Sequence, residues 1–208
     1  MTAFSYMASV YGICSTSLSV LNHNLEQTAR AIFGEICGEG EVGKLSDILT
    51  VCYGKDHKRL ADGNVPCYGS GGIMRYVDTA LYDGESVLIP RKGSLSNVLY
   101  VNEPFWTVDT MFYTQMTCLN VAKFAYFTVR DLDLAGMNVG SAVPSMTTAV
   151  LNELEIRLPP IDVLSEFEES VSPMFSQIQS NNADSANLTA IRDALLPRLM
   201  SGELSIDG

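Results

Sequence analysis

Three short segments of this 208-residue chain combine glycine with cationic, hydroxyl or amide side chains. They are residues 54–59 (GKDHKR), 68–76 (YGSGGIMRY) and 90–97 (PRKGSLSN). Lysine and arginine neutralise phosphates, and arginine, asparagine and serine also reach the edges of bases. The segments fit a nucleic-acid-binding surface, but a solvated surface with ordinary turns accounts for them equally well. The candidate binding residues are Lys55, His57, Lys58, Arg59, Tyr68, Ser70, Arg75, Arg91, Lys92, Ser94 and Asn97.

The glycine cluster at residues 69–72 matches none of the common catalytic or nucleotide-binding motifs. It lacks the Gly-Lys-Ser/Thr of a P-loop, and a dinucleotide-binding G-x-G-x-x-G would require glycine where Met74 stands. A serine nucleophile at Ser70 would require G-x-S-x-G, but residue 68 is tyrosine. No acidic pair with an adjacent lysine marks a metal-dependent nuclease. We therefore expect no catalytic site, and a hydrolase that uses Ser70 and His57 is kept only as a third hypothesis.

The cysteines and histidines do not form a metal site or a disulfide framework in the sequence. The chain has five cysteines, an odd number with no C-x-x-C pair, and two histidines without ligand-like partners nearby. No apolar run approaches the ~18 residues of a membrane span. The first twenty residues also lack the positive charge of a secretory signal. These observations predict a reduced, cytoplasmic protein that binds no metal and does not enter a membrane.

The net charge of −11 argues against nucleic acid when the chain is taken whole, but the charge is unevenly distributed. Residues 1–43 carry one basic and four acidic groups, a net charge of −3. Residues 44–130 carry nine basic and eight acidic groups, a net charge of +1, whereas residues 131–208 carry three and twelve, a net charge of −9. The middle segment therefore holds most of the cations, and an anion-binding face would lie there.

The elements that position these segments follow from hydrophobic periodicity. Apolar residues at three- and four-residue steps predict an amphipathic helix over 16–37, which Gly38-Glu39-Gly40 ends. From 42 to 118, short apolar runs at 87–89, 98–101 and 105–108 predict strands separated by turns. Residues 119–129 predict a buried helix, and alternation over 154–158 predicts a half-exposed strand.

A second helical pattern follows Pro159-Pro160. Apolar residues at 164, 167, 171, 174 and 178 form a heptad seam, and Asn181 and Ser185 continue it with polar side chains that could fix its register. Pro173 is expected to kink or interrupt this helix, and Pro197 and Gly202 are expected to end it. The pattern predicts a helix, a globular domain and a second helix, in that order.

The order and spacing of several motifs resemble the specificity (S) subunit of type I restriction-modification systems. The motifs are GKDHK, VPCYGSGGI, SVLIPRKGSLSNV, FWTVDTMFY, VPSMTTAVLNELEIRLPP and LLPRLMSGEL. The resemblance implies an α+β fold in which one β-rich target-recognition domain, residues 42–160, is flanked by long helices. Residues 1–41 and 161–208 would supply these helices, which form an antiparallel, coiled-coil-like spacer. The usual S subunit has two recognition domains, whereas this chain has one.

The resemblance implies a non-catalytic subunit that recognises a sequence in double-stranded DNA and directs adenine methylation and cleavage by its partners. Methyltransferase (M) subunits and a motor-nuclease (R) subunit would be the partners, and S-adenosylmethionine, ATP and magnesium would bind there and not to this chain. A half-length subunit is expected to form a homodimer through its helices and so to prefer an interrupted palindrome. The alternative is an adaptor that regulates the methyltransferase and reads no DNA, which the acidic C-terminal segment favours.

Overall fold

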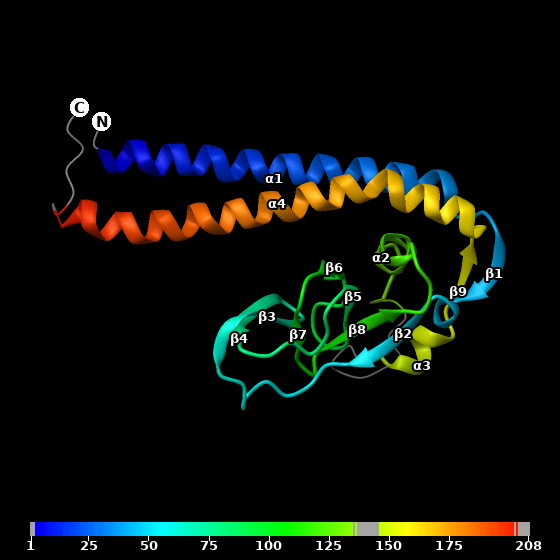
Figure 1. The fold of residues 1–208 in the computed structure, drawn as a ribbon. Helices are drawn as coiled ribbons and strands as arrows, with labels where there is room; N and C mark the ends of the chain where they lie inside the picture. The colour runs from blue at the N-terminus through cyan, green and yellow to red at the C-terminus, as the bar shows by residue number, and fades with distance from the viewer. Residues whose placement is uncertain (1–2, 135, 137–145, 202, 204–208) are drawn as a thin grey trace. The chain divides into compact units, whose positions relative to one another are not determined.

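The computed structural model describes all residues except 1–2, 135, 137–145, 202 and 204–208. It contains two compact units, and Figure 1 shows the chain coloured by residue number. One unit is Phe33–Glu168, and the other combines Met1–Ile32 with Glu169–Gly208. The first unit extends nine residues before and eight residues after the 42–160 segment that the sequence predicts as a domain.

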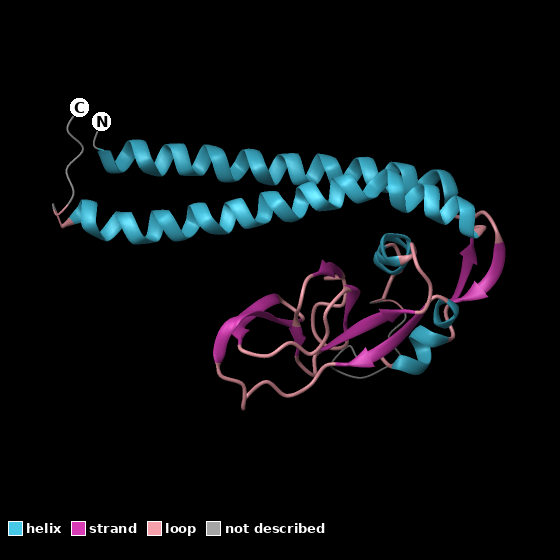
Figure 2. Cartoon of the chain, in the orientation of Figure 1, coloured by secondary structure: helices cyan, strands magenta, loops and turns pink. Residues whose placement is uncertain are grey.

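The 33–168 unit is built from short strands and small helices (Figure 2). Its strands form three sheets, with the orders β1-β9, β2-β8-β5-β6 and β4-β3-β7. All strand pairs are antiparallel except β3 with β7. The predicted α+β class is confirmed. The elements are β1 (Glu41–Lys44), the 3-10 helix η1 (Leu45–Asp47), β2 (Leu49–Tyr53), β3 (Asp62–Gly69), β4 (Gly72–Val77), β5 (Glu85–Pro90), β6 (Leu99–Asn102), β7 (Trp106–Thr107), β8 (Met111–Met116), α2 (Ala122–Arg130), α3 (Thr148–Asn152) and β9 (Glu155–Leu158).

A ring cluster packs against α2 in the core of this unit. Phe33 stacks on Phe127 with ring centroids 5.4 Å apart, and it also meets Phe124 and Phe167 at 5.6 and 6.2 Å. All four rings are buried. Aromatic rings bury large areas and prefer such tilted contacts, so this cluster stabilises the unit strongly. Two of its members, Phe33 and Phe167, come from outside the 42–160 segment.

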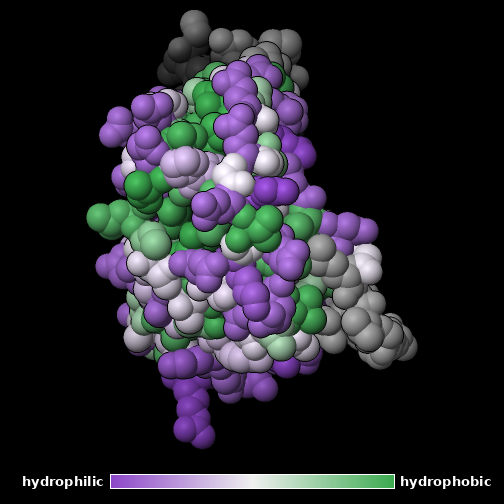
Figure 3. All heavy atoms as spheres, turned by 90° about the vertical axis from the view of Figure 1, so that its right-hand side faces the viewer, coloured by the Kyte–Doolittle hydropathy of each residue, from purple (hydrophilic) through white to green (hydrophobic). Residues whose placement is uncertain are grey.

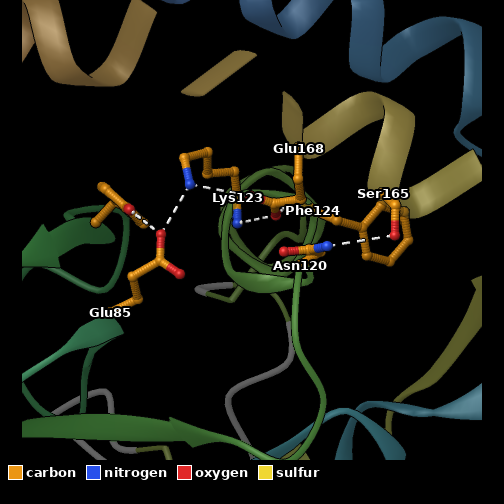
Figure 4. A network of polar contacts seen from close by, with 7 residues as sticks. Glu85, Asn120, Lys123, Phe124, Ser165 and Glu168 are labelled. Atoms are coloured by element: carbon orange, nitrogen blue, oxygen red, sulfur yellow. Dashed lines mark hydrogen bonds and ion pairs between the residues drawn. The ribbon is translucent and has the colours of Figure 1, made fainter. Parts of the chain in front are cut away.

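A buried ionic network joins α2 to residue 168 (Figure 4). Lys123 Nζ lies 2.8 Å from Glu85 Oε1 and 2.9 Å from Glu168 Oε2. Glu168 Oε1 also accepts hydrogen bonds from the backbone amides of Lys123 and Phe124, at 2.7 and 3.3 Å. Val121, the N-cap of α2, makes no side-chain cap. The Glu168 carboxylate therefore caps a helix to which it does not belong, where the helix dipole favours a negative charge.

The other unit is an antiparallel pair of long helices, α1 (Ala3–Ile36) and α4 (Ile161–Met200). The Asn181 amide donates to Asn22 Oδ1 at 2.6 Å, and the Asn22 amide donates to Asn182 Oδ1 at 2.8 Å. Asn181 is buried, as are Ala29, Val171 and Phe175. The predicted seam of the C-terminal helix is thus covered by α1 of the same chain, with Phe175 buried where Met174 was expected.

Both helices exceed the predicted bounds. The first begins at Ala3 instead of residue 16, and α4 passes through Pro173 and Pro197 before it ends at Met200. The helix is continuous through both prolines, so an interruption at Pro173 and a stop at Pro197 were wrong expectations; Gly202, the other expected stop, lies outside the described residues. A proline lacks one backbone donor but has a helical φ, and the buried Val171 and Phe175 on either side of Pro173 hold the helix in place. The carbonyl of Pro197 even accepts a hydrogen bond from Ser201 N at 2.9 Å.

The surface mixes hydrophilic and hydrophobic residues. Figure 3 views the side that carries β1 and β9, and hydrophobic atoms are exposed there among hydrophilic ones. In the 33–168 unit, Val42, Leu119 and Ile161 are the most exposed large apolar residues. None of the described helices is both long enough and apolar enough to cross a bilayer.

Candidate nucleic-acid interface

The three glycine-bearing segments that the sequence singles out are all attached to one stretch of chain, residues 106–111, which we call the anchor segment. Lys55 N donates to Thr107 O at 2.8 Å, and Val108 N donates to Tyr68 O at 3.0 Å. Arg91 N donates to Thr110 O at 2.8 Å. Because residues 107 and 110 are three positions apart, these attachment points lie within about 10 Å of one another. Segments far apart in the sequence therefore meet on one part of the domain.

The loop at residues 54–59 lies against the anchor segment because residue 54 is glycine. A Cβ at this position would lie 2.1 Å from Val108 O and 2.7 Å from Thr107 O, so only glycine permits the approach. The indole Nε1 of Trp106, also in the anchor segment, donates to Lys55 O at 3.0 Å and gives the loop a second attachment. The cationic side chains of this loop, Lys55, Lys58 and Arg59, are exposed.

His57 is placed differently from its neighbours in this loop. The residue is half-buried, and its Nδ1 is buried and finds no hydrogen-bond partner among the described residues. Its backbone carbonyl accepts from Leu60 N at 3.1 Å, which closes the loop. The His57 side chain is therefore less exposed than those of Lys55, Lys58 and Arg59.

The loop at residues 90–97 contacts both the anchor segment and the turn of the β3–β4 hairpin. Arg91 Nη1 donates to Asp109 O at 3.2 Å, and the guanidinium lies 5.4 Å from the centroid of the Tyr53 ring. The Asn97 amide donates to Ser70 O at 2.9 Å. Gly93 has a φ of +84°, which glycine tolerates, and a Cβ there would lie 3.2 Å from Ser70 Oγ. Lys92 and Ser94, the remaining candidates, are half-buried and exposed respectively.

The hairpin itself differs from the expectation at two positions. Tyr68 is buried in the core and its hydroxyl donates to Glu103 at 3.3 Å; burial and the nearby Glu103 charge both raise the pKa of this phenol. The guanidinium of Arg75 is also engaged, because its Nη2 lies 2.9 Å from Asp62 Oδ1 and 3.0 Å from Leu60 O. Tyr68 thus serves the packing of the core and Arg75 contacts its own domain, so our proposal rests on the other nine residues.

The structure brings nine of the eleven predicted residues to the loops around the anchor segment, and it adds two features that the sequence analysis missed. One is Tyr53, whose half-exposed ring supports Arg91. The other is the anchor segment, which ties the loops together through backbone groups. Residues 105–113 form one of the motifs that carry the resemblance to specificity subunits. The contacts of the anchor segment are made by backbone groups, however, and side-chain types do not reveal backbone hydrogen bonds. Its role was not visible from the sequence.

Comparison with known sequences gives one consistent result. Residues 38–186 match the family described as "Type I restriction modification DNA specificity domain". The chain is similar to the MjaIX specificity subunit of Methanocaldococcus jannaschii, with 29% identity over 133 residues, which are 61% of this chain and 31% of that protein. It is also similar to the HindI specificity subunit of Haemophilus influenzae, with 35% identity over 65 residues, 31% of this chain and 14% of that protein.

Solved structures share the fold. The S subunit of a type I restriction-modification system from M. genitalium has a TM-score of 0.72 at 17% identity, over 92% of this chain and 58% of that one. The HsdS subunit from Thermoanaerobacter tengcongensis has a TM-score of 0.50 at 11% identity, over 96% of this chain and 56% of that one. The chain therefore spans little more than half the length of these structures, and the aligned part is less than a third of the curated relatives.

Proposed function

We propose that this chain, which belongs to the family of type I restriction modification DNA specificity domains, recognises a base sequence in double-stranded DNA through its 33–168 unit. The family consists of specificity components and not of catalytic ones, which agrees with the expectation that the chain is not an enzyme. We also propose that the chain directs adenine methylation and DNA cleavage by its partner subunits.

The convergence of the three loops on the anchor segment carries this proposal. Each loop supplies at least one side chain that can contact phosphate or a base edge, and all are held by backbone hydrogen bonds within about 10 Å. We assign phosphate contacts to the cations and polar readout to the hydroxyl, amide and imidazole groups. The proposed contact residues are Lys55, His57, Lys58, Arg59, Ser70, Arg91, Lys92, Ser94 and Asn97.

The salt dependence of DNA binding tests this assignment. We expect Lys55→Ala and Lys92→Ala each to weaken binding and to flatten the slope of log affinity against log salt by about 0.9, because each lost phosphate contact releases fewer counterions. Binding is measured for the complex with the methyltransferase subunit on a duplex selected from random sequence. Arg157→Ala is the control, since Arg157 is an exposed cation on β9. Slopes equal to that of the control would remove both lysines from the interface.

The partners in this proposal are the methyltransferase and motor-nuclease subunits, whose cofactors would be S-adenosylmethionine, ATP and magnesium; the complex would act on cytoplasmic DNA. Residues 44–130 have a net charge of only +1, so additional phosphate contacts from the methyltransferase would raise the affinity. A second copy of this chain would supply the second recognition domain. The exposed apolar side chains of Val20, Leu21 and Ile191 on α1 and α4 give such a copy a surface to cover.

The second candidate function is an adaptor that binds the methyltransferase and reads no DNA. The net charge of −11 favours it, because a strongly acidic chain repels phosphate. Selection of binding sites from random duplexes separates the two functions. A recognition subunit returns a motif that changes when the anchored loops are replaced, whereas an adaptor returns the motif of its partners or none.

A further inference from the structure

The exposed side chains of β4 are apolar or aromatic, although the sequence suggested a polar and cationic surface. Ile73, Met74 and Tyr76 are 49, 57 and 49% exposed. Arg75, the one cation of β4, is held by Asp62 and the Leu60 carbonyl. Exposed aliphatic side chains that follow one another on one strand are uncommon on a surface that only water contacts, and they indicate a binding partner.

A β-bulge sets the direction of Met74. Cys67 pairs with Arg75 and Tyr68 pairs with Ile73, so the register shift leaves Met74 without an opposite residue in β3. Bulges bend a strand locally and re-aim its side chains, and β4 lies at the edge of its sheet. A Cβ on Gly69 would lie 2.4 Å from Met74 Sδ and 3.6 Å from Val108 Cγ2. The absence of that Cβ lets the thioether lie over Gly69, beside the anchor segment.

The end of the hairpin is held firmly while its outer strand stays accessible. Gly69 pairs with Gly72 across a two-residue turn, and Asn97 and Val108 fix the inner strand through the carbonyls of Ser70 and Tyr68. Nothing would lie within 4 Å of a Cβ on Gly71, so the turn points into open space. The hairpin supplies two strands of a three-stranded sheet, because β7 pairs with β3 at Cys67 and Tyr68, and its turn lies beside the cationic loops.

Resting on the DNA-recognition function proposed above, we propose that Ile73 and Met74 contact thymine methyl groups in the major groove and so determine part of the sequence specificity. The major groove admits a two-stranded β-ribbon, and the C5-methyl of thymine is the apolar group that distinguishes bases there. Met74 is well suited to such a contact, since its flexible, polarizable thioether adapts to the groove. The cations of the neighbouring loops reach the phosphates at the edges of the same groove.

Replacement of thymine by uracil tests the contact, because uracil lacks only the C5-methyl. The full chain in complex with its methyltransferase first selects a site from random duplexes, and each thymine of that site is then replaced by uracil. We expect about fourfold weaker binding at one or two positions, the effect of exposing one buried methyl group. Ile73→Ser and Met74→Gln should bind the thymine duplex more weakly and no longer distinguish it from the uracil duplex. Leu119→Gln, which changes an exposed apolar residue outside the hairpin, should leave this discrimination unchanged.

The possible results separate this inference from the function on which it rests. If the unaltered complex selects no site, the recognition function and the thymine contact both fail. If it selects a site but uracil replacement has no effect, or if both variants keep the discrimination, the thymine contact alone fails. If the variants lose the methyltransferase subunit in size-exclusion chromatography, the hairpin contacts protein and the thymine contact is again overturned. Unchanged thermal unfolding of each variant shows that the fold is intact.

Discussion

At the scale of single residues, Glu168 stands out because one carboxylate makes three contacts with α2. It caps the helix through the amides of Lys123 and Phe124, and it pairs with Lys123 Nζ. Glu168→Ala would take one of its carboxylate partners from Lys123 and remove the cap, so we expect the free energy of unfolding to fall by about 3–5 kcal/mol. Glu168→Gln keeps an oxygen for the amides and should cost less. Urea unfolding of the full chain measures both, and equal losses would contradict the capping role.

The same network makes stability depend on pH. Burial raises the pKa of Glu85, but hydrogen bonds from Lys123 and Tyr100 outweigh it and bring the pKa below its usual 4.5. Burial lowers the pKa of Lys123, but Glu85 and Glu168 outweigh it and raise the pKa above its usual 10.5. The Glu85 contribution is therefore present above pH 4.5 and lost as the pH falls through the lowered pKa. The Lys123 contribution is present below pH 10.5 and lost as the pH rises through the raised one.

We therefore expect the free energy of unfolding to decline when the pH falls below about 4.5 or rises above about 10.5. Lys123→Met should make both declines smaller. Urea unfolding between pH 2 and 12 measures the effect. Lys44→Met is the matched control, because Lys44 pairs with Glu153 on the surface, with its side chain 47% exposed. Such exposed pairs contribute little. Curves of the same shape for the two variants would show that the buried network does not govern the pH dependence.

At the scale of elements, two glycines of the interface have opposite surroundings. A Cβ at Gly54 would lie 2.1 Å from the backbone carbonyl of Val108, whereas a Cβ at Gly71 would meet nothing within 4 Å. Gly54→Ala should detach the 54–59 loop from the anchor segment and lower the free energy of unfolding by about 1–3 kcal/mol. Gly71→Ala should leave it nearly unchanged. Urea unfolding and amide hydrogen exchange at Lys55 measure the two effects, and a loss at Gly71 as large as that at Gly54 would contradict this account.

The sequence predicts about half of the individual elements and few of their contacts. Alternation and short apolar runs place β5, β6 and β9 close to their true bounds, because local patterns determine a half-buried strand. The helix predicted over 119–129 begins instead at Ala122, since Asn120 has a φ of +56° and the cap comes from residue 168. The contacts among the three loops, the burial of Tyr68 and the ion pair of Arg75 depend on tertiary structure that side-chain types alone do not encode.

At the scale of the whole molecule, the covering of the α4 seam by α1 changes how two copies could associate. The predicted homodimer cannot use the seam residues Leu164, Phe167, Val171 and Asn181, which are already buried within one chain. If it forms, it must use outward-facing residues such as Val20, Leu21 and Ile191. We expect a dimer in sedimentation equilibrium at micromolar concentration, and Val20→Asp with Ile191→Asp should give a monomer. A monomeric unaltered chain would contradict the predicted homodimer.

The cap that Glu168 places on α2 has a consequence for exchanging recognition domains between proteins of this kind. A graft cut at Pro159-Pro160 would leave Lys123 without Glu168, and it would uncover the rings of Phe124 and Phe127 that Phe33 and Phe167 now bury. The exchangeable module must therefore carry the last turn of one long helix and the first two turns of the other. Recombination that alters specificity without loss of folding should have its junctions inside the helices, beyond residues 33 and 168.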